Sequence, residues 1–555
     1  MARATAADPE FRLSADTVGP IVEICRGVDG LPLALELAAA RVRSMGAAEL
    51  ADRLHGGFAV LSAGSRRAPR HRTLDATVRW SYELLGFAEQ LLFLRLSVFA
   101  TTFTIEDAEE TCADDAVNRD AIANLIGALV DKSMATADTT LQPTRYSLLE
   151  TLRAFGRERL DSATGLALRR RHLARAIREV EQARTELDGP DESGWGDRVE
   201  ERFDDLRVAH RWALANRDVD AALRLVVGLR EFAFRRMRYE LFSWVDATLM
   251  LPDVDRHPLG AAAVASAAYG RFVRGDLDRA MTLAERSLEI ERRDEVPPCG
   301  LHWRTMGNVA YYRGQADLAA DFCSLMVDAA RRDGTATRLV HALYMASVGL
   351  ASAGQTEDSK RLADEALALA ETTGNPTALA SALYASGLAV EDAHPDLAAA
   401  LLRRAVTHGD AGGNRWIGAF ARTELVSLAG RSGDLDVALA DASSVIDTWY
   451  RAGDWANQWL TLRQVAGVFA RRGELHHAAV LHAAVRNALA DTAMPIAADD
   501  SLRVAEMLGR LPSQLGSQGV DAAEREAAAM SANEVVHHTR HTIDRMLGPV
   551  GAAGR

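Results

Sequence analysis

A short segment recurs at intervals of about 40 residues through the second half of the chain. Most copies begin with a glycine, continue with acidic or polar residues, and place a small residue five positions later. A fixed period of this length is typical of repeat proteins, in which each unit packs on its neighbours and cannot bury its apolar face alone. The period therefore predicts a solenoid of similar units over residues 256–490. The anchors, separated by 39, 40, 40, 39 and 40 residues, are Gly275, Gly314, Gly354, His394, Gly433 and Gly473.

Each unit is predicted to be a pair of helices. The anchoring glycine would end the first helix in a left-handed turn, and the acidic residues after it favour the N-terminus of the second helix. The pattern resembles tetratricopeptide repeats lengthened from 34 to about 40 residues. The small residues expected where the two helices of a pair approach closely are Ala280, Ala319, Ser359, Ala438 and Ala478.

Helix-hairpin arrays of this kind carry a concave surface that binds peptides or proteins. We therefore expect a protein or effector ligand on the array. The candidate groove residues on predicted first helices are Arg304, Tyr311, Tyr312 and Tyr344. Ordinary packing between helices is the alternative for each of them.

The composition predicts a mainly all-α protein. The 555 residues are rich in alanine and leucine, contain few β-branched runs and are 6% aromatic. The net charge of −13 opposes non-specific DNA binding, which depends on neutralising phosphates. A basic leader and an apolar run long enough to span a membrane are both missing from the sequence, so we expect a cytoplasmic protein with no membrane partner. The four cysteines lack the paired spacing of metal or redox motifs.

Four stretches between residues 30 and 160 carry a resemblance to a known family. They read GLPLALELAAARV from Gly30, TLDATVRWSYELL from Thr73, LSVFATTFTIEDAEETC from Leu96, and LVDKSM from Leu129 followed by RYSLLETLRAFGRERL from Arg145. In this order they resemble the GLPL helical subdomain and the winged helix of STAND-type signalling ATPases, the NB-ARC group. The likeness is to the bacterial branch that often ends in a LuxR-type helix-turn-helix. It implies a regulatory protein that acts in signal transduction.

The resemblance implies a nucleotide-contacting wall at Pro32 and Leu33, because the GLPL proline lies against bound nucleotide in that family. A phosphate-binding loop of the form GxxxxGK[ST] is missing from the sequence, and neither Lys132 nor Lys360 follows the required glycine. We therefore expect no cofactor and no enzymatic activity in this chain. The nucleotide domain and the terminal helix-turn-helix of the family are expected to be missing, and a separate nucleotide-binding chain could supply the former.

The family also senses phosphate through a histidine on the helix after the wing. The matching positions here are Leu148, Leu149 and Glu150, and a leucine cannot donate a hydrogen bond to phosphate. A core role for Leu148 and Leu149, together with Leu152, explains these residues instead.

Histidines with helical spacing occur near the C-terminus, at His537, His538 and His541, close to Glu534. Such spacing can hold a metal when the ligands converge. We expect a solvated helix and no metal site.

The winged helix offers an alternative function, DNA binding. Residues 131–136 and 145–148 are predicted to form its hairpin wing, with Pro143 near the turn. The predicted recognition helix, residues 119–130, carries one basic residue, Arg119. Because major-groove readers present several Arg, Lys, Asn or Gln side chains, we do not expect direct contact with nucleic acid.

These observations divide the chain into five predicted segments. They are a GLPL-containing helical subdomain at 1–65, a winged-helix-like domain at 66–162, a helical linker with the first irregular repeats at 163–255, the tetratricopeptide-like repeats at 256–490, and C-terminal helices with a disordered end at 491–555. The predicted function is that of a non-catalytic regulator, the sensor and scaffold part of a STAND-type transcriptional regulator. The alternative is a transcriptional regulator that binds DNA through the winged helix.

Overall fold

The computed structural model describes residues 77–294, 300–490 and 507–548, together with scattered residues between 20 and 51. Pro32 and Leu33 lie outside the described residues. The chain divides into two compact units, one formed by Met1–Arg178 with Glu200–Trp212 and the other by Glu179–Val199 with Ala213–Arg555. The described residues are mainly helical, as the composition predicts. The five-segment division predicted from the sequence is finer than the two units and stays a prediction.

The first unit contains a group of short helices and a β-hairpin. Its strands pair antiparallel, with Thr136 opposite Ser147, which confirms the predicted wing hairpin and its second strand. The first strand was predicted too early in the chain, because residue 131 still belongs to a helix and the strand is Thr136–Asp138. The elements are α6 (Phe87–Leu96), α7 (Ile105–Cys112), η1 (Arg119–Ala121), α8 (Ile122–Asp131), β1 (Thr136–Asp138), β2 (Arg145–Ser147) and α9 (Glu150–Arg159).

Local signals fix the start of α7 and the core around it. The Thr104 hydroxyl accepts from the Asp107 backbone amide, and the Asp107 carboxylate accepts from the Thr104 amide, which makes a reciprocal cap. Leu148 and Leu152 lie in the same apolar core, as predicted. The core role predicted for Leu149 is wrong, because its side chain is 41% exposed. Leu149 precedes the first turn of α9 in an extended conformation, which turns it away from the core.

Two long helices, α10 (Ser162–Glu186) and α11 (Glu192–Ala215), contain the boundary between the units. The second unit then continues through short helices that precede the repeats. These are α12 (Val219–Gly228), α13 (Arg230–Arg235), α14 (Glu240–Thr248) and η2 (Val254–Arg256).

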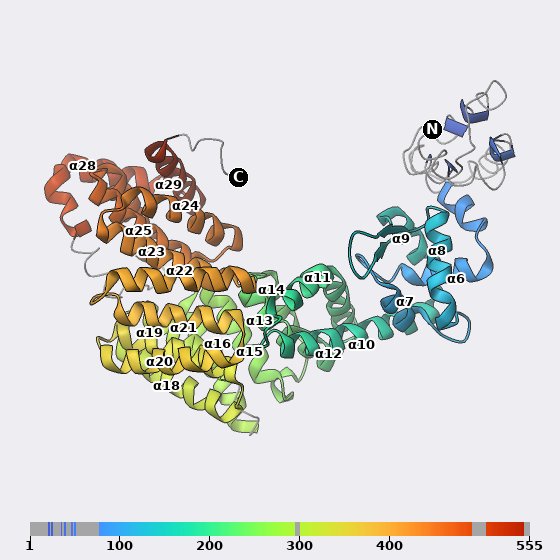
Figure 1. The fold of residues 1–555 in the computed structure, drawn as a ribbon, viewed down its shortest axis with the longest axis horizontal. Helices are drawn as coiled ribbons and strands as arrows, with labels where there is room; N and C mark the ends of the chain where they lie inside the picture. Colours follow the sequence, from blue (N-terminus) through green and yellow to red (C-terminus); the bar gives the residue numbers. More distant parts are fainter. Residues whose placement is uncertain are drawn as a thin grey trace. The chain divides into compact units, whose positions relative to one another are not determined.

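Six helical hairpins follow and stack in chain order, from green through yellow to orange in Figure 1. The pairs are α15 (Gly260–Val273) with α16 (Leu277–Asp294), α17 (Leu301–Tyr312) with α18 (Ala316–Asp333), α19 (Ala336–Ser352) with α20 (Thr356–Thr373), α21 (Pro376–Val390) with α22 (Pro395–Gly412), α23 (Arg415–Ser432) with α24 (Leu435–Ala452), and α25 (Trp455–Arg472) with α26 (Leu475–Ala490). The last described helices, α28 (Leu511–Ala528) and α29 (Ala532–Leu547), pack on the end of this array.

The turn inside each hairpin follows the predicted chemistry. All five anchoring glycines have positive φ, which is the left-handed conformation that glycine adopts without strain. The five small residues after them are all buried at the close approach of the paired helices. The prediction of helix pairs with glycine turns is therefore confirmed.

A second set of glycines, which the sequence analysis did not identify, forms the turns between hairpins. Gly374, Gly413 and Gly453 all have positive φ, and each is followed by a buried residue that caps the next helix. Each cap accepts from the backbone amide of the third residue of its helix, α21, α23 or α25, and the capping residues are Asn375, Asn414 and Asp454.

Contacts between distant repeats close part of the inner side of the array. Helix α15 of the first hairpin contacts α25 of the sixth, and α13 contacts α23. The hydroxyl of Tyr312 donates to the side-chain oxygen of Asn457 at 2.7 Å, and both residues are buried. At these positions the inner surface is filled by packed side chains and does not form an open groove.

Candidate ligand site

The four groove residues predicted from the sequence occupy two different places. Tyr311, Tyr312 and Tyr344 line a small cavity of about 40 Å³ between the first helices of the repeats. Tyr312 and Tyr344 are buried, and Tyr311 is half-buried. Arg304 instead lines a much larger cavity of about 380 Å³. Only Arg304 of the four is therefore placed where a ligand of appreciable size could reach it.

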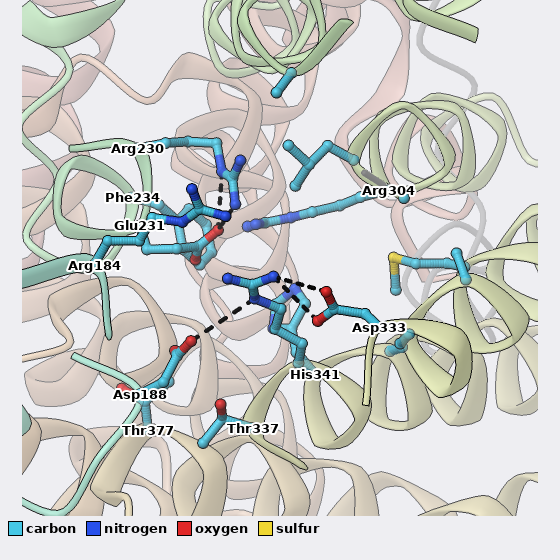
Figure 2. Close-up of a pocket in the computed structure, with 18 of the residues that line it drawn as sticks. Arg184, Asp188, Arg230, Glu231, Phe234, Arg304, Asp333, Thr337, His341 and Thr377 are labelled. Carbon is cyan, nitrogen blue, oxygen red and sulfur yellow. Dashed lines mark hydrogen bonds and ion pairs between the residues drawn. The ribbon is translucent and has the colours of Figure 1, made fainter. Parts of the chain in front are cut away.

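The larger cavity, which we call the arginine cavity, lies within the second unit and is shown in Figure 2. Its volume is within the roughly 300–1,000 Å³ typical of small-molecule sites. Helices α10, α13, α17, α18, α19 and α21 all contribute side chains, so the site is built where the pre-repeat helices meet the first four hairpins. Five arginines and three carboxylates line it: Arg184, Arg230, Arg235, Arg304, Arg338, Asp188, Glu231 and Asp333.

Two of these arginines, Arg235 and Arg338, form ion pairs with carboxylates at one end of the cavity. Arg235 bonds Asp188 at 2.8 Å and the buried Glu192 at 3.1 Å. Arg338 lies 3.1 Å from Asp333 and 3.8 Å from Asp188. These pairs hold the α10–α11 connection against α13 and α19, and Figure 2 marks those of Asp188 and Asp333.

A second group of charges surrounds Glu231. Arg230 donates to Glu231 at 2.9 and 3.0 Å. Figure 2 shows Arg184 and Arg304 directed toward the same carboxylate from different elements. Burial by itself raises the pKa of Glu231, but Arg230, Arg304 and Arg235 together hold this pKa well below its usual range. Glu231 is therefore ionised and shares its charge among several guanidinium groups.

Arg304 packs its guanidinium on aromatic rings. The guanidinium carbon lies 3.8 Å from the centroid of the Phe234 ring and 4.6 Å from that of Tyr269. A cation over the face of an aromatic ring is attracted by the ring quadrupole, more strongly where water is excluded. This stacking orients Arg304, so its direction in the cavity is fixed before any ligand binds.

Two polar atoms of α19 near the cavity are buried without a hydrogen-bond partner among the described residues. They are the hydroxyl of Thr337 and Nε2 of His341. Burial and the nearby Arg304 lower the pKa of His341 to about 3, so the imidazole is neutral at ordinary pH. A neutral imidazole presents one donor and one acceptor. Both residues line the cavity and therefore bring unused hydrogen-bonding capacity to its wall.

A buried network forms one side of the cavity. Glu192 accepts from the backbone amide of Thr377 at 2.9 Å, and Asn414 donates to the Thr377 hydroxyl at 3.0 Å. Asn375 donates to the backbone oxygens of Leu187 and Gly189. The inter-hairpin caps thus fasten the α10–α11 connection onto the repeats.

Sequence reasoning found one residue of this site, Arg304. The missed residues include Arg230, Glu231 and Phe234, which belong to the short helix α13 before the repeats begin. The periodicity carries no information about that helix. A sequence pattern for the α21 side of the cavity did exist. The glycines of the second set are separated by 39 and 40 residues, and each is followed by Asn or Asp.

The winged-helix surface has a different character. The exposed face of α8 carries Ala123, Asn124, Gly127 and Asp131, and no residue of α8 is basic. Arg119, which precedes α8, pairs with Glu109 at 3.1 Å. This face therefore lacks the cationic side chains that commonly read the major groove.

Comparison with known proteins identifies the small N-terminal domain. Residues 85–161 match the sequence family described as "Winged helix-turn-helix domain". This chain contains a winged helix-turn-helix domain. The wing β1–β2 and helices α6 to α9 lie within the matched residues.

Longer similarity connects the winged helix-turn-helix chain to mycobacterial proteins. It is 31% identical over 392 residues to "Putative HTH-type transcriptional regulator Rv0890c" of Mycobacterium tuberculosis, covering 67% of this chain and 43% of that protein. It is 35% identical over 178 residues to "Uncharacterized protein Rv0894" of the same organism, covering 31% of this chain and 45% of that protein. The chain thus spans less than half the length of these curated relatives.

Two solved structures are also similar. One is a STAND protein with a tetratricopeptide repeat sensor from Pyrococcus horikoshii, at 12% identity and a TM-score of 0.44, covering 93% of this chain and 75% of that one. The other is a Rap protein complexed with competence and sporulation factor, at 12% identity and a TM-score of 0.43, covering 68% of this chain and 99% of that one.

Within the described residues, no helix is long and apolar enough to cross a membrane.

Proposed function

We propose that this chain is a non-catalytic regulatory protein, the sensor and scaffold part of a STAND-type transcriptional regulator, whose helical array binds an effector in the arginine cavity. The arginine cavity carries the proposal, because a preformed space with oriented, unneutralised side chains is what a ligand site requires. The regulatory context is supported by the winged helix-turn-helix match and by relatives named as transcriptional regulators.

The position of the cavity suits a sensor. It is bounded on one side by α10 and α13 and on the other by α17, α19 and α21. A ligand that touches both sides favours one arrangement of these helices over others, and such differential binding is the requirement for a regulatory change. In this proposal the chain catalyses no reaction, and any nucleotide-dependent step belongs to a separate nucleotide-binding segment or chain.

The experiment is a comparison of transcript profiles in the organism that carries the gene. A strain with Arg304→Glu on the chromosome should change the same transcripts as a deletion strain, because a carboxylate beside Glu231 reverses the charge that the cavity presents. The matched control is Arg404→Glu on the exposed side of α22. If the deletion changes no transcripts, the regulatory proposal is wrong.

The second candidate function is DNA binding through the winged helix, favoured by the family match to residues 85–161. The exposed face of α8 and the net charge of −13 oppose it. A fluorescence anisotropy titration with random-sequence duplex DNA at low salt decides between the two. Binding that weakens on Asn124→Ala would establish this candidate, whereas no binding at micromolar protein would remove it.

A further inference from the structure

We propose that the ligand of the arginine cavity is a small organic anion, with its charged group held by Arg184 and Arg304 and its apolar part packed against Phe234. This inference rests on the proposed function for the place of the ligand and adds its chemical class. Carboxylate and phosphate groups share the chemistry that a cluster of guanidinium groups recognises.

The first argument is the charge of the cavity wall. Among the described residues, the ion pairs of the cavity use Arg230, Arg235 and Arg338, and no ion pair reaches Arg184 or Arg304. Five guanidinium groups line the cavity against three lining carboxylates, and buried Glu192 behind Arg235 supplies a fourth, so one positive charge remains in excess. Buried charge of one sign is stabilised when a partner of the other sign is supplied.

The second argument is the convergence of the two arginines that make no direct ion pair. Arg304 is 7% exposed and is oriented by Phe234, whereas Arg184 is more exposed and lies at the rim. Partial burial and the like charges of Arg338 and Arg230 lower the pKa of Arg184. An anion bound between Arg184 and Arg304 would offset this repulsion.

The third argument is that two polar atoms without hydrogen-bond partners lie near the charged groups. The Thr337 hydroxyl belongs to a residue that is 8% exposed, and neither this hydroxyl nor Nε2 of His341 has a hydrogen-bond partner among the described residues. Leaving a buried polar group unpaired is costly, so such groups mark places where a ligand completes the bonding. They lie one helical turn apart on α19, and both can bond oxygen atoms of a ligand.

The fourth argument concerns the remainder of the wall. Apolar side chains also line the cavity, including Phe234, Leu259, Leu301 and Met326. Inorganic ions cannot use this surface. The combination of a cationic end and an apolar wall therefore favours an organic anion over phosphate or sulfate alone.

The test uses two fluorescent probes that differ in charge. Anilinonaphthalene sulfonate carries an anionic group, and phenylnaphthylamine has the same rings without it. We expect saturable binding of the sulfonate to the full chain, weakened about tenfold or more by Arg304→Gln and by Arg184→Gln, because each loses charge-assisted hydrogen bonds. The uncharged probe should respond by less than twofold.

Controls separate loss of the site from loss of the fold. Arg404→Gln removes an exposed arginine outside the cavity and should leave sulfonate binding unchanged. Arg304→Lys keeps the charge and should retain more binding than Arg304→Gln. Circular dichroism and the melting temperature establish that each variant is folded.

Competition distinguishes the sources of the anionic group. Benzoate and phenyl phosphate should displace the sulfonate probe, whereas the uncharged benzyl alcohol should not. The stronger of the two anionic competitors shows whether the site prefers a carboxylate or a phosphate. Equal weakening of both probes by Arg304→Gln, or equal effects of Arg304→Gln and Arg404→Gln, would overturn the anion assignment. If the transcripts are nevertheless altered in the Arg304→Glu strain, the proposed regulatory function would hold and the ligand would be uncharged.

Discussion

The hydroxyl of Tyr239 donates a hydrogen bond to a carboxylate oxygen of Asp454 at 2.9 Å, across a separation of 215 residues. Tyr239 lies at the start of α14, before the repeats, and Asp454 caps α25 in the sixth hairpin. Both side chains are buried. This bond, together with the packing of α15 on α25, ties the beginning of the array to its end.

Asp454 should make the stability of the array depend on pH. Burial raises its pKa to about 6 from 3.8, against the effect of hydrogen bonds from Asn457 and Tyr239. A carboxyl group whose pKa is higher in the folded state stabilises that state at low pH, and this contribution is lost as the pH rises from about 4 through about 6. In Asp454→Asn the apparent melting temperature should therefore fall less than in the wild type over this range.

The comparison must be a difference between variants, since other carboxylates, such as Glu231, have lowered pKa values and the opposite pH dependence. Asp434→Asn is the matched control, because Asp434 precedes α24 but is exposed and makes no side-chain cap. Identical pH profiles for Asp454→Asn and Asp434→Asn would contradict the expectation.

Tyr239→Phe should destabilise the array by about 1–3 kcal/mol at neutral pH, because it removes a hydrogen bond to a buried carboxylate. The Tyr239 hydroxyl lowers the pKa of Asp454, so its removal should raise that pKa further. The loss should be smaller in the Asp454→Asn background. Urea unfolding of the two single variants and the double variant measures this coupling, and strict additivity would show that the two side chains do not interact.

Replacement by alanine should change the stability in opposite directions at two helix glycines, Gly127 and Gly260. A Cβ at Gly127 in α8 meets no atom within 4 Å, so Gly127→Ala should stabilise the winged helix by about 0.5–1 kcal/mol through helix propensity. A Cβ at Gly260 would lie 2.3 Å from the backbone oxygen of Val254, so Gly260→Ala should destabilise the array. Differential scanning calorimetry of both variants gives the sign directly, and the same sign for both would refute the expectation.

Arg235→Met should cost the array about 3–5 kcal/mol, because it leaves the buried Glu192 without its guanidinium partner and Asp188 with only the more distant Arg338. The control is Arg224→Met, which breaks a more exposed pair with Glu181 and should cost about 1 kcal/mol or less. Chemical denaturation followed by far-ultraviolet circular dichroism measures both. Similar losses for the two variants would show that the buried pair has no special role.

Local features were predictable from sequence because they depend on residues close together in the chain. The glycine turns at Gly275 and Gly433, the small residues packed after them, and the wing strands all follow from short-range conformational preferences. The core role predicted for Leu149 was wrong because α9 begins at Glu150, so Leu149 lies before the helix and not on its apolar face.

Only part of the arginine cavity could be predicted from the sequence. Arg304 was identified on the first helix of a repeat, but its neighbours Arg184 and Glu231 lie more than 70 residues away, outside the periodic region. The identity of each repeat unit as a helix pair comes from the 40-residue period alone, because each unit repeats the same local preferences. The burial of Tyr312 and Tyr344 and the convergence of charges from α10, α13 and α17 were decided by the tertiary structure. Small rotations between successive hairpins add up along a solenoid, and side-chain packing sets each rotation, so only the folded chain shows which distant residues meet.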